Sequence, residues 1–187
     1  MFLVILFASV AYVCNCEYWL HRIFMHRPVW KFDYPFRAHA VTHHGLFKSD
    51  KTYHVQNDAD KEKIPMAWWN GPALVTLFGL PMVFVSWLLG MWSIVVTVVI
   101  VAAIYYGLYE YLHWCMHLPL QKRRIIERSW FFCRLNGHHL LHHRYMGKNF
   151  NVVLPFCDLC YGTLMLRSKI RFPQARGPSV PDVQPRQ

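Results

Sequence analysis

The stretch from Ile64 to Tyr109 contains no Asp, Glu, Lys or Arg. A bilayer core about 30 Å thick is crossed by about 20 apolar residues of α-helix. The stretch is therefore long enough for two crossings, and Gly90 is placed to form the turn between them. Pro72 and Pro81 lie in the first of these crossings and predict a kinked or partly broken helix.

The first twenty residues are also uncharged up to Glu17 and can form a third crossing. The alternative is a cleaved signal peptide, but no Lys or Arg precedes the apolar stretch, which favours a retained helix. Hydrophobic residues make up 55% of the chain and charged residues 16%, below the proportion of charge usual in soluble domains. We therefore expect an all-α fold, an integral membrane helical bundle with about three to four membrane-embedded helices.

One domain is expected over residues 1–172. The residues from 173 to 187 are rich in Pro, Gln and Arg without apolar periodicity, which predicts a disordered tail. Pro28 is expected to end or kink the helix that continues the first crossing. A short helix is expected over Arg37–Leu46, and the polar stretch from Ser49 to Lys63 is expected to form a surface excursion.

The net charge of +10 comes from Lys and Arg residues confined to two blocks, Arg22–Lys63 and Lys122–Arg186. Basic segments flanking apolar spans mark the cytoplasmic side of a membrane. One topology, in which the first span runs inward and the other two form a hairpin, places both blocks there. This favours a multi-pass protein of the bacterial inner membrane or the endoplasmic reticulum over a nucleic-acid-binding protein.

Twelve histidines are present, and eleven of them form four groups that this topology brings to one membrane face. Residues three and four apart share a helix face, so His113 and His117 can hold one metal between them. The same reasoning pairs His39 with His43, and His139 with His142 and His143. His21 and His26 are five apart, about 140° around an ideal α-helix, unless Pro28 loosens the last turn.

Imidazole suits iron, zinc, copper and nickel, and ten candidate ligands are too many for one ion but suit two. His54 stands alone, and His138 is ambiguous beside His139. A histidine-rich helical cap on the cytoplasmic face is thus predicted to bind metal through His21, His26, His39, His43, His44, His113, His117, His139, His142 and His143.

The kind of metal chemistry is narrowed by what surrounds these histidines. A hydrolytic zinc helix carries Glu directly after its first histidine, whereas this chain has Trp after His113. Axial histidines for a haem would lie within the spans, but these lie at the span ends. Iron used with O2 remains, with the apolar spans providing a pocket that excludes water.

Five stretches carry a resemblance to a known family: His21-Arg-Ile-Phe-Met-His26-Arg27, His39-Ala-Val-Thr-His43-His44, His113-Trp-Cys-Met-His117, His139-Leu-Leu-His142-His143, and Asn149-Phe-Asn-Val-Val-Leu-Pro-Phe-Cys-Asp158 running into Tyr161-Gly-Thr163. Here the sequence resembles the fatty acid hydroxylase / sterol desaturase superfamily of membrane diiron enzymes, which includes the beta-carotene hydroxylases. The second stretch departs from the pattern, because three residues separate His39 from His43 where many hydroxylases have two.

The resemblance implies two iron ions, for which zinc can substitute in a purified sample, and O2 as co-substrate. It implies hydroxylation or desaturation of a lipid substrate, with a fatty acyl chain favoured, and no catalytic side chain beyond the metal ligands. Electrons would come from a separate electron-transfer protein, a ferredoxin or a b-type cytochrome with its reductase.

Other interpretations stay open at this point. A membrane metal-binding or transport protein with a histidine-rich cap would need polar residues threading its spans. Glu17, Glu110 and Asp158 are either acceptors that orient ligand imidazoles or simple caps and solvent-facing groups. Cys157 and Cys160 have metal-binding spacing, but without a second pair they are interpreted as small apolar positions.

Overall fold

The computed structural model describes residues 1–119 and 125–166, and these residues are helical, with no β-strand among them. The predicted disordered tail lies outside the described residues. Three helices are long and apolar enough to cross a membrane: the first over Phe2–Met25, α4 over Asn70–Leu89 and α5 over Ser93–His117. The all-α prediction is confirmed, and the described spans number three.

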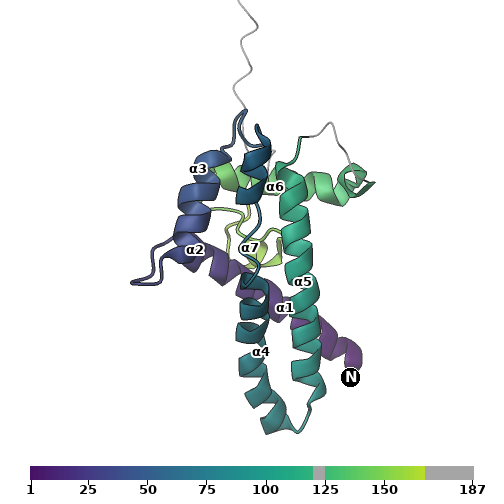
Figure 1. Cartoon of the computed structure of the whole chain (residues 1–187). Coiled ribbons are helices and arrows are strands. Elements are labelled where there is room, and N and C mark those ends of the chain that lie inside the picture. Colours follow the sequence, from purple (N-terminus) through teal and green to yellow (C-terminus); the bar gives the residue numbers. More distant parts are fainter. Residues whose placement is uncertain (120–124, 167–187) are drawn as a thin grey trace, which may run out of the picture.

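The helices α4 and α5 form the predicted hairpin, with its turn at Gly90 (Figure 1). Gly90 has a φ of 64°, a left-handed conformation that glycine adopts without a steric penalty. The Ser86 hydroxyl accepts a hydrogen bond from the Val95 N–H at 3.0 Å and so ties the two helices together beside the turn. Although Pro81 lies inside α4, the helix is unbroken from Asn70 to Leu89, contrary to the predicted break.

The two hairpin helices approach each other closely where glycine replaces a side chain. A Cβ atom on Gly71 would lie 2.7 Å from the Tyr106 ring, so any larger residue there would force the ring to move. Large apolar side chains on the other faces of both helices point outward, including Leu80, Trp87 and Ile104, each more than half exposed. Outward apolar side chains on helices of this length are those of a membrane protein.

The first span contains two kinds of helix. The α-helix α1, Phe2–Trp19, packs against α5 and continues as a π-helix, η1, over Leu20–Met25. As predicted from Pro28, the helical run stops just before the proline, at Met25.

Short helices make up the cap at one end of the hairpin (Figure 1). The first three follow one another along the chain: α2 over Tyr34–Phe36, a second π-helix (η2) over Arg37–His43, and α3 over His44–Leu46. The predicted helix over Arg37–Leu46 is therefore present, but most of it is a π-helix. The remaining elements are the 3₁₀ helices Asp58–Lys63 and Ile125–Arg128, α6 over Trp130–Arg144, and α7 over Phe156–Cys160.

The polar stretch after Ser49 is only partly the surface excursion that its composition predicted. Tyr53 and Val55 are buried within it, and the Val55 N–H donates a hydrogen bond of 2.8 Å to the His117 carbonyl. The stretch therefore closes over the end of α5, and its exposed polar residues flank this buried contact.

Candidate metal centre

The ten histidines predicted as ligands come together in two groups. Within each group, one ring nitrogen from every member lies within 4.8 Å of those of all the others. All are buried except His26, which is partly exposed. Group A consists of His21, His26, His39, His44 and His142, and group B consists of His43, His113, His117, His139 and His143. Each group could hold a metal ion.

The membership of the groups corrects two of the pairings expected from α-helical spacing. His39 and His43 lie in different groups, as do His139 and His142. The segment Arg37–His43 is a π-helix, in which hydrogen bonds run between residues i and i+5. Residues five apart then come to nearly the same side, so that His39 is grouped with His44 instead.

The same geometry brings His21 and His26 together. Both belong to group A, and their rings stack with centroids 5.0 Å apart. The π-helix over Leu20–Met25 removes the offset of about 140° that an α-helix would impose on residues five apart. Both five-residue spacings in the site are thus accommodated by the same rare helix type.

Group B draws on ordinary α-helix geometry. His113 and His117 are four apart on α5, and His139 and His143 are four apart on α6. Residues at this spacing are neighbours on one helix face. His43 completes the group from η2, with its Nε2 3.1 Å from that of His113.

The closest nitrogen–nitrogen distances test whether a metal fits. Imidazole nitrogen binds Zn²⁺ at about 2.0–2.1 Å, and two ligands at right angles at that radius lie about 3.0 Å apart. Contacts between Nε2 atoms match this spacing in both groups. In group A they are 2.8 Å for His21–His39, 3.0 Å for His26–His142 and 3.1 Å for His44–His39. In group B they are 3.1 Å for His113–His43, 3.2 Å for His117–His139 and 3.0 Å for His143–His139.

Backbone carbonyl oxygens contact five of these imidazole rings on the side opposite Nε2. Each of the five contacts a carbonyl oxygen through Nδ1, which fixes the proton on Nδ1 and leaves the Nε2 lone pair free for a metal. The pairs are His21 with Phe150, His43 with Lys63 at 3.3 Å, His117 with Tyr53 at 2.8 Å, His142 with Lys148 at 2.7 Å, and His143 with Phe47.

Burial also keeps the cap histidines in the neutral form that binds metal. It lowers the pKa of His43 to about 3 and that of His142 to about 4, below the ordinary value of 6.5. The pKa of His139 is lowered well below the same value, first by burial and then by its neighbouring histidines. At neutral pH these side chains are neutral bases.

The two histidines omitted from the predicted ligands lie outside both groups. His138 contacts Asp158, with 3.2 Å between Nε2 and the Oδ2 atom of the carboxylate. His54 has no hydrogen-bond partner at Nε2 among the described residues. Cys157 is buried and Cys160 exposed, and neither belongs to a group.

The candidate orienting carboxylates act on the backbone and not on the ligand rings. Asp158 accepts hydrogen bonds of 2.8 Å from the N–H groups of both Phe150 and Asn151, and one of 2.6 Å from Thr163. Glu17 accepts a hydrogen bond of 2.7 Å from the Val152 N–H. Both carboxylates therefore fix the segment 150–152, whose Phe150 carbonyl in turn holds His21. Glu110 lies elsewhere and accepts from the Met66 N–H.

The charge on Asp158 is maintained by these contacts. Burial alone would raise the pKa of Asp158, but hydrogen bonds from His138, Thr163 and the backbone hold it below its ordinary value. The carboxylate is therefore ionised at neutral pH, and it is fully buried.

Replacing Asp158 by Asn is expected to lower the free energy of unfolding by about 3 kcal/mol, because one acceptor oxygen becomes a donor facing buried donors. Thermal unfolding in detergent measures the change. Asp50→Asn is the matched control, since Asp50 caps an exposed turn through the Thr52 N–H. Equal unfolding midpoints for the two variants would contradict the role given to Asp158.

Several parts of this centre had no signal in the sequence. The carbonyl oxygens of Phe47, Tyr53 and Phe150 contact ligand rings, yet any residue supplies such an oxygen. Tyr53 also packs its ring 4.8 Å from that of His117, inside a stretch whose composition is polar.

Comparison with protein-family models, curated proteins and solved structures gives no match to this chain. The resemblance to the hydroxylase and desaturase superfamily therefore stays a prediction. What the chain itself provides is a helical membrane protein with two buried histidine groups that could hold metal ions.

Proposed function

We propose that this protein is a membrane-bound non-haem diiron oxidoreductase that uses O2 and an external electron donor to hydroxylate or desaturate a lipid, with a fatty acyl chain favoured. The observation that carries the proposal is the pair of five-histidine groups. Five nitrogen ligands exceed the four of a typical zinc site and leave one position of an octahedron for another molecule. When bound, the two irons would supply the oxidation of a C–H bond by O2.

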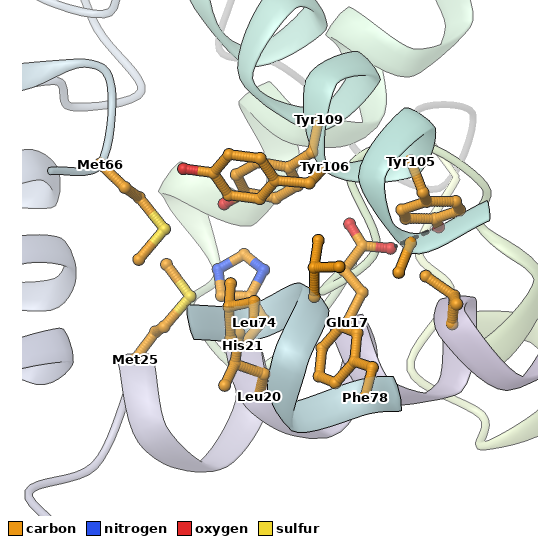
Figure 2. A pocket seen from close by; sticks show the side chains of 13 residues that line it. Glu17, Leu20, His21, Met25, Met66, Leu74, Phe78, Tyr105, Tyr106 and Tyr109 are labelled. Atoms are coloured by element: carbon orange, nitrogen blue, oxygen red, sulfur yellow. Dashed lines mark hydrogen bonds between the residues drawn. The ribbon is translucent and has the colours of Figure 1, made fainter. Parts of the chain in front are cut away.

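The residues beside group A support a lipid substrate. A pocket between α1, α4 and α5 has His21 of group A in its wall and is lined mostly by apolar side chains, including Leu20, Leu74 and Phe78 (Figure 2). Such a pocket binds a hydrocarbon segment and excludes water from the metal side of the site. The role of the protein would be to hold one segment of the lipid's hydrocarbon chain beside the histidine groups.

Transport of metal through the membrane is less well supported. Three polar side chains of the hairpin, Asn70, Ser86 and Thr97, form hydrogen bonds to other groups of the protein. Thr97 donates to the Ser93 carbonyl at 2.7 Å, and Asn70 donates to the Ala67 carbonyl at 2.9 Å. Asn70 also donates to the Tyr34 hydroxyl at 3.3 Å. These side chains are satisfied by nearby protein groups, whereas an ion path would need polar groups free to face a passing ion.

The proposed orientation places both histidine groups on the cytoplasmic face, because the basic blocks border them. A separate electron carrier, a ferredoxin or a b-type cytochrome with its reductase, would then reach the site from the cytoplasm. A basic surface favours the docking of an acidic carrier.

The experiment is turnover of a host lipid extract under ¹⁸O2 by protein expressed in iron-replete medium, with a reductase and carrier supplied. The expected result is two irons per chain and a lipid product heavier by one ¹⁸O atom. A desaturated product would instead show the loss of two hydrogens without label. Protein that contains no iron after anaerobic reconstitution with Fe²⁺, and that yields neither product, would refute the proposal.

A further inference from the structure

One hydroxyl group in the apolar pocket, that of Tyr109, lacks a hydrogen-bond partner among the described residues. The Tyr109 hydroxyl makes no hydrogen bond to any part of the chain that the structure describes, although the residue is only 7% exposed. Its ring stacks beside that of His113 in group B, with centroids 5.6 Å apart. A buried hydroxyl without a partner is unfavourable, since it has lost its hydrogen bonds to water.

The other polar groups of the pocket are committed to the protein. Glu17 accepts from the Tyr105 hydroxyl at 2.7 Å, and Tyr106 has Glu110 as its hydrogen-bond partner. Figure 2 shows Tyr109 facing the same pocket as His21 and Met66. The Tyr109 hydroxyl is therefore the lining group, among these residues, that is available to a bound molecule.

Tyr109 also lines two cavities that together reach both histidine groups. A second cavity shares Met25, Met66 and Tyr109 with the first, and its walls include His39, His43 and His113. The two cavities have volumes of about 40 and 60 Å³. Since one water-sized sphere needs about 10–15 Å³, each holds only a few atoms of a ligand. These atoms would be the ones presented to the metals.

We propose that the Tyr109 hydroxyl binds an oxygen atom of the substrate. The site would then take a long-chain lipid that carries a hydroxyl or carbonyl group close to the carbon presented to the histidine groups. A plain hydrocarbon segment would leave the hydroxyl unpaired, and a site built to pair a polar group rejects analogues that lack it. The identity of the reacting carbon rests on the proposed function, whereas the preference for an oxygen-bearing chain is a property of binding.

The test compares 1-hexadecanol with hexadecane as probes, added from mixed micelles to the purified full chain, with the thermal unfolding midpoint as the readout. Wild-type protein is expected to bind hexadecanol at least about tenfold more tightly than hexadecane. Tyr109→Phe removes this preference and leaves hexadecane binding unchanged. The variant is expected to fold normally, because the hydroxyl it loses has no partner among residues 1–119 and 125–166.

Tyr111→Phe is the matched control, since Tyr111 lies on the same helix with 41% of its surface exposed and lines neither cavity. It should keep the wild-type preference. The proposal is overturned if wild-type protein binds both probes equally, if it binds neither, or if the preference survives Tyr109→Phe. A trapped water would then be the partner of the Tyr109 hydroxyl. The readout needs neither turnover nor iron. A Tyr109-dependent preference in a protein that takes up no Fe²⁺ on reconstitution and yields no product would therefore refute the proposed function and leave this inference standing.

Discussion

His113→Ala and His142→Ala are each expected to reduce the bound iron from two ions per chain to one, and to abolish turnover. His113 lies on α5 and belongs to group B, whereas His142 lies on α6 and belongs to group A. Removing one of five ligands opens a buried, preorganised site, whereas the other group keeps its full set. Iron content by elemental analysis, together with turnover of the lipid extract, measures both effects.

The double variant is expected to contain no iron. His54→Ala is the control, because His54 lies outside both groups, and it should keep two irons and wild-type turnover. Insertion into the membrane should be unchanged in all of these variants, since none of the substitutions adds charge to a span. The assignment of two separate sites fails if both single variants retain two irons.

Removal of the metal with a chelator is expected to lower the thermal unfolding midpoint by about 10 °C. A ligand at a thousand times its dissociation constant stabilises the folded state by about 4 kcal/mol, and each kcal/mol shifts the midpoint of a chain this size by about 2–4 °C. The folded state without metal is destabilised by the close approach of ring nitrogens. Without a cation, Nε2 atoms such as those of His21 and His39, 2.8 Å apart, face each other in a buried site.

The iron-free double variant of His113 and His142 is the reference for this measurement. Chelator should leave its midpoint where it is, and readdition of Fe²⁺ should restore only the wild-type protein. A wild-type midpoint that does not respond to the chelator, with loss of iron verified, would show that the histidine groups are stable without metal.

Much of the fold could be predicted because its strongest determinants are local. The charge-free stretch specified two crossings, and Gly90, with its φ of 64°, specified the turn between them. Of the predicted kinked or partly broken helix, the break is absent, because α4 continues through Pro81. Membrane-spanning helices tolerate a proline where neighbouring groups satisfy the backbone carbonyl that it leaves unpaired.

The gathering of the ten candidate histidines could be predicted, but which five of them form each group could not. Grouping histidines by their spacing requires an assumption about the type of helix, and α-helix geometry places His39 beside His43. The π-helices that overturn this assignment arise from packing around the centre, and a single sequence carries no signal for them. Phe150 and Tyr53 were missed for a related reason, because they act through backbone carbonyls.

Each histidine group takes four members from one half of the chain and one member from the other half. His43, from the N-terminal half, completes the group otherwise formed by α5 and α6, and His142 from α6 completes the group formed by the N-terminal residues. Neither set is complete on a nascent chain until α6 has left the ribosome, by which time all three spans have been made. Loading of metal into either group would therefore be a late step of biogenesis, and a chain truncated before α6 would enter the membrane with both groups short of histidines.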